Sequence, residues 1–308
     1  MQPSYVELYE RGILGKIAEK LCGAMARCTL CPHGCGVDRA SSASGKCRTG
    51  MRPVISSYNA HLGEEAPLVG DHGSGTIFFT NCNLACIYCQ NYDISHFGGG
   101  REVSYEDCAS MMLALQKKGC HNINFVSPTH QIYAIVRALE LAVPGGLKVP
   151  LVYNSGGYDS VATLQEVNGI FDIYMPDFKY MDPDVSEKLS GAPDYPSAAA
   201  AAIREMHRQV GDLVLDSRGV AVRGLLVRHL VLPNNIALTD RIIEFIADLS
   251  KNTYFNIMDQ YRPEHRAHEC FDLRRRVTLQ EYDEAQEHAQ RAGLTRIDGY
   301  RHAVRRFL

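Results

Sequence analysis

The sequence predicts an α/β protein, a partial (βα)6 barrel preceded by a small Cys-rich N-terminal lobe. Two observations predict this fold. From Gly75 onward, short apolar runs alternate with helical patterns, as in βαβ units built around a parallel sheet. Before Gly75, the chain after its first helical segment is rich in Gly, Ser, Cys and Pro and shows little periodicity. We therefore divide the chain into an N-terminal helix and lobe at 1–74 and a barrel with a C-terminal extension at 75–308.

The first segment is expected to form an amphipathic helix over residues 4–26. Ser4 and Glu7 have the spacing of a capping box, and the uninterrupted apolar region of a signal peptide is missing. No stretch of the sequence approaches the length of a membrane span. The formal net charge of −3 gives no strong signal for nucleic-acid binding. These features favour a cytoplasmic protein that does not bind a membrane.

Six short apolar runs are the expected barrel strands, and a closed eight-unit barrel would need more chain. Helical patterns separate them. One of these is rich in alanine, the best helix former, and Ser197 is expected to cap it. The expected strands are 75–80, 122–126, 149–153, 171–175, 224–232 and 253–258, and the expected helices are 104–118, 129–142, 158–168, 197–210, 238–250 and 278–292.

The chain has eleven cysteines, and seven of them fall into two groups. In a reducing compartment, clustered cysteines are more often metal ligands or catalytic groups than disulfide partners. The scattered ones are interpreted as small buried hydrophobic residues: Cys22, Cys108, Cys120 and Cys270.

One group has C-x3-C-x2-C spacing directly after the first expected barrel strand: Cys82, Cys86 and Cys89. Thiolates hold iron–sulfur clusters, and a 4Fe-4S cluster has four irons that need ligands. Three cysteines can ligate three irons and leave the fourth iron for an external group. A zinc site made of the same thiolates and a histidine such as His96 is the alternative.

The other group, here called the N-terminal quartet, has C-x2-C-x3-C-x11-C spacing: Cys28, Cys31, Cys35 and Cys47. Four cysteines can close a site for Zn2+ or for a second iron–sulfur cluster, and this spacing leaves the metal open. Four unliganded thiols are a poorer interpretation, because this lobe has little else to hold it together. An iron–sulfur cluster there could relay electrons, whereas zinc would stabilise the lobe.

The three-cysteine motif, with Tyr88 just before its last cysteine, resembles the signature of the radical S-adenosyl-L-methionine (SAM) superfamily. The flanking sequence GSGTIFFTNCNLACIYCQNYDIS resembles the pyruvate formate-lyase activating enzymes, particularly relatives with an N-terminal cysteine motif. The resemblance covers about residues 27–263. It implies a 4Fe-4S cluster whose open iron binds SAM, and reductive cleavage of SAM to a 5′-deoxyadenosyl radical that abstracts hydrogen. It also implies an electron donor such as flavodoxin or ferredoxin, and a glycyl radical enzyme as protein substrate.

The resemblance extends to other expected strand ends, where parallel α/β folds place their chemistry. Asp177 and Lys179 match an Asp-x-Lys element of the SAM site, and Arg228 matches an arginine that approaches SAM. Asn154 and Ser155 are candidates for contact with the methionine moiety or the ribose, and Tyr88 belongs to the same cofactor-binding set. The alternatives are an exposed ion pair for Asp177 and Lys179, a salt-bridged barrel arginine, and a simple turn after the third strand.

A departure from the activating enzymes follows the second expected strand. Those enzymes have a Gly-Gly-Glu element there that binds the SAM amino group, whereas this chain has FVSPTH at 125–130. Ser127 and Thr129 can supply polar contacts, but a neutral hydroxyl does not replace a carboxylate opposite an ammonium group. Either SAM binds differently, or another acid such as Asp177 takes this role.

The sequence is compatible with two other functions. The same radical could modify a small molecule, a peptide or a nucleic acid. A non-enzymatic iron–sulfur electron carrier or redox sensor is the other possibility. The three-cysteine motif counts against a carrier, because a carrier has no use for an open iron.

Overall fold

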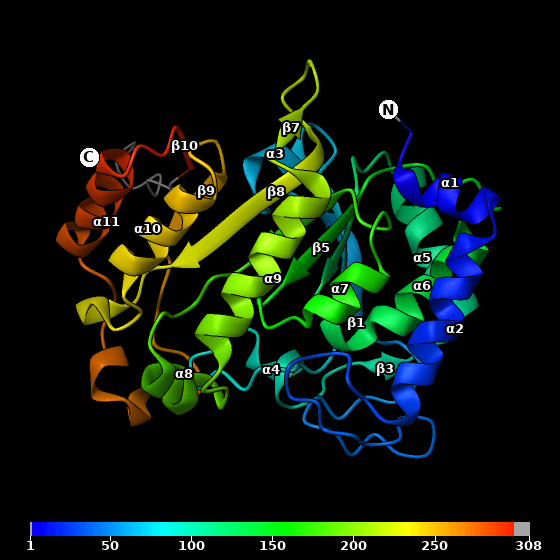
Figure 1. Cartoon of the computed structure of the whole chain (residues 1–308), viewed down its shortest axis with the longest axis horizontal. Coiled ribbons are helices and arrows are strands. Elements are labelled where there is room, and N and C mark those ends of the chain that lie inside the picture. Colours follow the sequence, from blue (N-terminus) through cyan, green and yellow to red (C-terminus); the bar gives the residue numbers. More distant parts are fainter. Residues whose placement is uncertain (1, 299–308) are drawn as a thin grey trace.

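The computed structural model describes residues 2–298, which contain one mixed sheet with the strand order β10-β9-β8-β6-β5-β4-β2-β1-β3 (Figure 1). Seven consecutive strands of this order, from β10 to β2, are parallel, and six of them are the strands that the sequence predicts. Within the described residues the sheet ends at β10 and β3 and does not close, which confirms the partial barrel. The six predicted strands are β2 (Ser74–Phe79), β4 (Ile123–Val126), β5 (Leu151–Ser155), β6 (Ile173–Pro176), β8 (Ala221–Leu230) and β9 (Tyr254–Met258).

The expected helices are all present and pack around the sheet (Figure 1). Local signals explain several of their starts: α5 and α11 have capping boxes, Ser104 with Asp107 and Thr278 with Glu281. Their bounds are α5 (Tyr105–Lys117), α6 (Ile132–Ala142), α7 (Val161–Glu166), α9 (Tyr195–Val210), α10 (Thr239–Leu249) and α11 (Leu279–Arg291), and α8 (Pro183–Ser190) is additional.

The alanine-rich helix α9 starts earlier than predicted. Its first residue is Tyr195, after the N-cap residue Asp194. Ser197 is not the cap, because its hydroxyl donates to the carbonyl oxygen of Asp194 at 2.9 Å from within the first turn. Pro at the second helical position makes the earlier start favourable, since its fixed φ suits the first turn.

The predicted N-terminal helix is two helices, α1 (Ser4–Glu10) and α2 (Ile13–Ala26), separated at Gly12, whose φ is 67°. The expected capping box is also wrong, because the N-cap residue is Pro3 and the Ser4 backbone N–H donates to Asp172 Oδ1 at 3.3 Å. Tertiary contact with the barrel thus replaces the local cap. Cys22, expected to be buried, is exposed on α2, whereas three scattered cysteines are buried as predicted: Cys108, Cys120 and Cys270.

Part of the predicted N-terminal lobe is strand. β1 (Val54–His61) pairs antiparallel with β2, and β3 (Arg101–Glu102) pairs with β1. The sequence does not predict β1, because most of its side chains are exposed and so form no apolar pattern. The division of the chain at residue 74 stays a proposal. The remaining short elements are α3 (Ala66–Val69), α4 (Tyr92–Ser95), β7 (Val214–Leu215), β10 (Arg296–Asp298) and 3-10 turns at Thr129–Gln131, Pro233–Asn235, Ala267–Glu269 and Phe271–Leu273.

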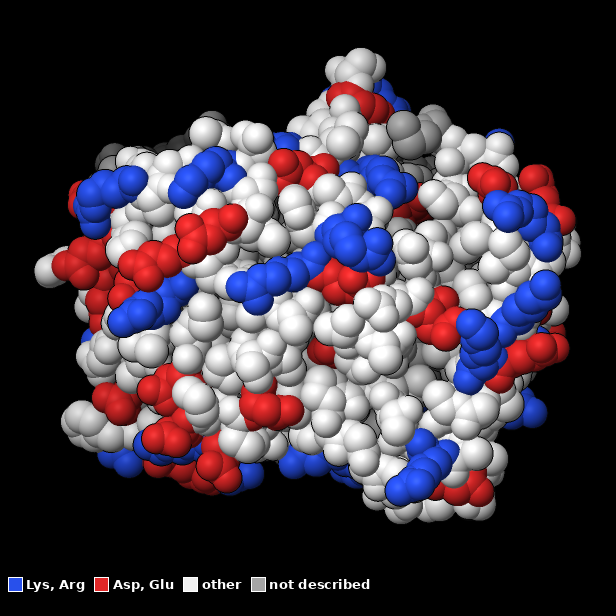
Figure 2. Space-filling model, viewed as in Figure 1, with Lys and Arg blue, Asp and Glu red and all other residues white. Residues whose placement is uncertain are grey.

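The carboxyl ends of the parallel strands point to the lower side of Figure 1. Helices α4 and α8 and the blue loop that follows α2 gather at the same side. Among the described helices, none has the length and apolar character needed to cross a membrane. The face shown in Figure 2 carries Lys and Arg mixed with Asp and Glu, without an extended basic area.

Candidate functional site

The cysteine loop, residues 80–91, follows β2 at the carboxyl end of the sheet. Cys86 is buried, and Cys82 and Cys89 are half-buried. Burial, with a smaller contribution from the Cys86 thiol, raises the pKa of Cys82 to about 12. The backbone N–H of Leu84 donates to Cys82 Sγ at 3.3 Å, and the Ser95 hydroxyl lies 3.1 Å from Cys89 Sγ. The thiols therefore lie within electrostatic reach of each other and have hydrogen-bond partners that suit thiolate ligands.

A chain of buried hydroxyl groups ends at the sulfur of Cys86. Ser190 donates to Cys86 Sγ at 3.0 Å and lies 2.9 Å from the hydroxyl of Tyr180, which donates to the hydroxyl of Tyr88. The Tyr88 ring also contacts Tyr261 edge-on, with 5.9 Å between ring centroids. Tyr88 is thus fixed inside the barrel by its ring and its hydroxyl. Its predicted contact with SAM stays a prediction.

The predicted residues Asp177, Lys179, Arg228 and Asn154 meet beside the cysteine loop. The parallel register puts Asp177 next to Arg228, whose Nε donates to Asp177 Oδ1 at 2.9 Å. Lys179 Nζ lies 2.7 Å from Asp177 Oδ2, and Arg228 Nη2 donates to Asn154 Oδ1 at 2.7 Å. Burial acts to raise the pKa of Asp177, but Arg228 and Lys179 outweigh it and lower the pKa. This carboxylate is therefore ionised and held between two cations.

Lys179 connects this ionic group to the cysteines. Burial raises the pKa of the Cys86 thiol, and the charge of Lys179 is the largest effect that opposes this rise. The neighbour of Arg228 on β8, His229, points away: it is fully buried, its Nδ1 lies 2.7 Å from the Phe178 carbonyl oxygen, and burial lowers its pKa to about 4. Strand alternation thus puts only Arg228 in the site.

Two acidic residues that the sequence analysis did not select belong to the same group. Glu64 and Glu65 lie in the loop between β1 and β2 and reach the barrel from its amino end. Arg228 Nη1 lies 3.4 Å from Glu64 Oε1 and 3.7 Å from Glu65 Oε1. Glu64 also accepts a hydrogen bond from Asn124 at 2.7 Å, and Glu65 accepts one from Asn256. Their only signal in the sequence is an adjacent pair of acids before an Ala-Pro helix start.

The hydroxyl groups predicted after the second and third strands bond to another buried acid, Asp159. Thr129 Oγ1 and Ser155 Oγ each donate to Asp159 at 2.6 Å, and the Tyr153 hydroxyl donates to it at 2.8 Å. Ser127 is half-buried and has a left-handed backbone, with φ 58°. Asp159 itself was missed, because a lone acid after a Gly-Gly-Tyr turn carries no motif. The SAM contacts predicted for Ser127, Thr129 and Ser155 stay predictions.

The N-terminal quartet also forms one group. Cys28 and Cys47 are buried, Cys31 is half-buried and Cys35 is exposed. Burial raises the pKa of Cys31 to about 12, and the thiols of the other three cysteines contribute to the rise. Four thiols spread over twenty residues of sequence are therefore within electrostatic reach of each other.

The donor set suits iron–sulfur chemistry at the cysteine loop. Within residues 2–298, no three Cys, His, Asp or Glu side chains converge on a point that a single ion could occupy. A 4Fe-4S cluster does not need that convergence, because each thiolate binds a different iron. The three sulfurs of Cys82, Cys86 and Cys89 each have a hydrogen-bond partner, and the charge of Lys179 acts on Cys82 and Cys86, so this loop fits such a cluster.

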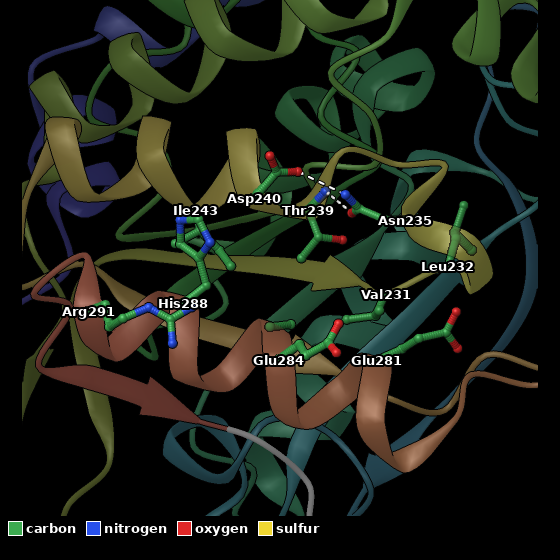
Figure 3. Close-up of a pocket in the computed structure, with 11 residues that line it drawn as sticks. Val231, Leu232, Asn235, Thr239, Asp240, Ile243, Glu281, Glu284, His288 and Arg291 are labelled. Carbon is green, nitrogen blue, oxygen red and sulfur yellow. Dashed lines mark hydrogen bonds between the residues drawn. The ribbon is translucent and has the colours of Figure 1, made fainter.

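A cavity of about 310 Å3 lies apart from these residues, between α10 and α11 (Figure 3). Asp240, Glu284, His288 and Arg291 are among the side chains that line it, and Asn235 donates to Asp240 at 3.0 Å. None of the residues predicted for the cysteine or SAM sites lines this cavity.

Comparisons with known proteins identify the family. Residues 76–217 match the model of the radical SAM superfamily. An uncharacterized protein of Methanocaldococcus jannaschii is 32% identical over 279 residues, which cover 88% of this chain and 76% of that protein. The chain belongs to the radical SAM superfamily. A solved structure of a radical SAM methyltransferase from Sphaerobacter thermophilus is 13% identical and covers 74% of this chain and 68% of its own, with a TM-score of 0.48.

Membership of the radical SAM superfamily implies a 4Fe-4S cluster and SAM as cofactors. The geometry of the cysteine loop fits its predicted role of holding the cluster, and that role stays a prediction. Three half-buried or buried thiols lie at the carboxyl end of the sheet, beside an ionic group of Asp177, Lys179 and Arg228.

Glu65 predicts a testable pH dependence of the free energy of unfolding. Burial raises the pKa of Glu65 to about 7 from an ordinary value of 4.5, although Arg228 opposes the rise. Between these values the folded state binds more protons than the unfolded state, so the free energy of unfolding falls as the pH rises from about 4.5 to 7. We expect Glu65→Gln to remove this fall, which is on the order of 3 kcal/mol.

The measurement is urea unfolding of the anaerobic protein at several pH values. The difference in free energy between wild type and Glu65→Gln isolates the contribution of Glu65, because other titrating groups are common to both. Glu10→Gln, at an exposed position of α1, is the matched control and should follow the wild type. Parallel pH profiles for wild type and Glu65→Gln would contradict the prediction.

Proposed function

We propose that this radical SAM protein is an enzyme that activates a glycyl radical enzyme, by abstracting hydrogen from a glycine Cα of that partner. When bound, the 4Fe-4S cluster and SAM supply a 5′-deoxyadenosyl radical for this step. The observation that carries the proposal is the ionic group of Asp177, Lys179 and Arg228 beside Cys86, because it matches the Asp-x-Lys and Arg elements of the activating enzymes. The open sheet is compatible with a polypeptide substrate.

In this proposal each group of side chains has its own task. The three thiolates of the cysteine loop hold the cluster. Asp177 would bind the SAM amino group in place of the missing glutamate, and Lys179 and Arg228 keep that carboxylate ionised. The buried tyrosines behind Cys86 exclude water, which matters because a primary carbon radical reacts with almost any nearby C–H bond.

The same proposal includes the partners and the compartment. A flavodoxin or ferredoxin donates the electron, the protein is cytoplasmic, and the N-terminal quartet holds a second metal. Of the two predicted alternatives, an iron–sulfur cluster fits better than Zn2+, because no three ligands among the described residues converge on a single ion.

A second candidate function is radical modification of a small polar molecule. Inside the barrel, Asn124 Oδ1 and Asn256 Oδ1 are buried and have no hydrogen-bond partner within the described residues. Buried amide oxygens normally have partners, so these two are available to a donor on a ligand.

The two candidates differ in where the abstracted hydrogen comes from. Cells of the source organism would be grown on α-deuterated glycine, and their anaerobic extract would be separated into macromolecules and small molecules. The reduced protein and SAM are then added to each fraction. We expect deuterium in 5′-deoxyadenosine, measured by mass spectrometry, with the macromolecular fraction, together with a glycyl radical signal in electron paramagnetic resonance spectra.

The other outcomes are equally informative. Hydrogen transfer from the small-molecule fraction alone would replace the proposal with the second candidate. Formation of 5′-deoxyadenosine without deuterium from either fraction would reject glycine as the hydrogen source. Fractions incubated with the reduced protein but without SAM are the control, and they give the background level of 5′-deoxyadenosine in the extract.

A further inference from the structure

A buried arginine beside the N-terminal quartet lacks a carboxylate partner. Arg39 is 2% exposed and donates to the carbonyl oxygens of Thr49 at 2.7 Å, Gly50 at 2.9 Å and His130 at 2.7 Å. Its Nη1 has no hydrogen-bond partner within the described residues. No ion pair found among residues 2–298 includes Arg39. Its positive charge is thus solvated by dipoles alone.

Such a charge is unfavourable without a counter-charge. A guanidinium stays protonated in proteins, and a buried unpaired ion costs several kcal/mol even after relaxation of its surroundings. The bonds of Arg39 to Thr49 and Gly50 hold it against the backbone that follows Cys47, and the Cys28 N–H donates to the carbonyl oxygen of Val37 at 2.9 Å, two residues before Arg39. The groups beside it that can become anionic are therefore quartet thiols. Free thiols are neutral, so they leave the arginine unpaired.

Metal binding would supply the missing charge. A metal ligates thiolates and not thiols, and four thiolates around a 4Fe-4S cluster keep a net negative charge. Such a cluster does not need the convergence on one point that a single Zn2+ ion needs and that no three ligands of the described residues show. We propose that the N-terminal quartet holds an anionic thiolate–metal centre whose buried counter-charge is Arg39, and that this centre fixes the N-terminal lobe against the cysteine loop. This deepens the second metal site named above and does not depend on a glycyl radical substrate.

The contacts of the lobe explain why the centre matters for the radical SAM site. His33, in the quartet segment, has its Nε2 2.7 Å from the carbonyl oxygen of Asn83, which lies between two cysteines of the loop. Arg48, next to the last quartet cysteine, donates to Asn81 Oδ1 at 3.3 Å and to the carbonyl oxygen of His96 at 2.5 Å. The quartet therefore supports both sides of the cysteine loop. A lobe that loses its metal should release these contacts.

Metal analysis of the intact protein tests the site itself. A variant with Cys82, Cys86 and Cys89 all changed to alanine removes the radical SAM cluster, so the metal that stays reports the quartet alone. We expect about four irons per chain in this variant by elemental analysis, and zinc in place of iron would overturn the assignment of an iron–sulfur centre. We expect this metal to vanish when Cys28→Ser and Cys31→Ser are added. Equal, negligible metal in both variants would overturn the proposal.

The role of Arg39 is tested by two substitutions with opposite properties. Arg39→Lys keeps the charge, and Arg39→Gln keeps hydrogen-bond donors without charge. In the background that lacks the three loop cysteines, we expect a chelator to remove metal at least tenfold faster from Arg39→Gln than from Arg39→Lys. Arg52→Met, at an exposed arginine of the same lobe, should match the unchanged background. Equal rates for the Lys and Gln variants would show that charge is not the reason, and would overturn this assignment.

Hydrogen exchange tests the support of the cysteine loop. Cys31→Ser in the otherwise wild-type chain should speed exchange in residues 81–96 at least tenfold, while exchange in α9 stays unchanged. Unchanged exchange in residues 81–96, after loss of the quartet metal is verified, would overturn the supporting role. SAM cleavage is not a readout in any of these experiments, so a failure here is distinct from a failure of the proposed function.

Discussion

Replacing Cys86 with alanine is expected to reduce 5′-deoxyadenosine formation to background, a loss of more than about 100-fold. Cys86 is buried, accepts a hydrogen bond from Ser190 and lies near Lys179. Loss of one of three thiolates removes the ligand of one iron. Substitution of a residue that only hydrogen-bonds to a metal ligand typically lowers metal affinity or activity about 10–100-fold. Substitution of a direct ligand should therefore lower activity further.

The measurement is anaerobic. Reconstituted and dithionite-reduced protein is mixed with SAM, 5′-deoxyadenosine is quantified by chromatography, and iron and zinc are counted. Cys108→Ala is the matched control, because Cys108 is also fully buried but lies on α5 and outside both cysteine groups. Equal product from wild type and Cys86→Ala would contradict the assignment of the cluster site. A reduced, intact wild-type cluster that neither binds nor cleaves SAM would instead favour an electron carrier.

Arg228→Met is expected to have the largest effect on stability, a loss of about 3–5 kcal/mol in the free energy of unfolding. The arginine is the shared partner of three carboxylates, Asp177, Glu64 and Glu65. Without it, these acids repel each other in a mostly buried site, and Lys179 alone cannot balance them. Arg228→Lys should lose less stability, because lysine keeps the positive charge. It should still be less stable than the wild type, because lysine lacks the planar guanidinium that reaches several partners.

Urea unfolding under anaerobic conditions measures this effect, and equilibrium binding of SAM to the reconstituted protein measures its consequence for the cofactor site. Arg218→Met is the control, because Arg218 pairs with Asp216 with 64% of its side chain exposed, and such pairs contribute at most about 1 kcal/mol. A loss for Arg228→Met as small as that of the control would mean that the ionic group contributes little to the fold.

Much of the barrel could be predicted because its information is local. The six predicted strands are mostly buried on both faces and so form short apolar runs in the sequence, as in β5, where every residue is buried. The cysteine loop could be predicted for a similar reason, since its three ligands lie within eight residues of sequence. The Asp177–Lys179 pair likewise needs only strand alternation to bring its two side chains to one side.

Other features could not be read from local patterns. β1 lies between β2 and the edge strand β3 and has mostly exposed side chains, so it carries no apolar alternation and was interpreted as part of an irregular lobe. The capping box at Ser4 was wrong because Asp172, far away in sequence, accepts from the same backbone N–H. In both cases a tertiary contact decides the conformation where the local preference is weak.

The sequence by itself determined the open α/β barrel, the three-thiol loop and the identity of one acid–lysine pair, because each depends on neighbours in the chain. Only the tertiary structure decided which charges share one site. Glu64 meets Arg228 across 164 residues, and Arg39 comes to lie between the quartet and His130, 91 residues away. The physical reason is that a buried charge takes its free energy from whichever groups the folded chain brings near it, and this proximity has no periodic signature in the sequence.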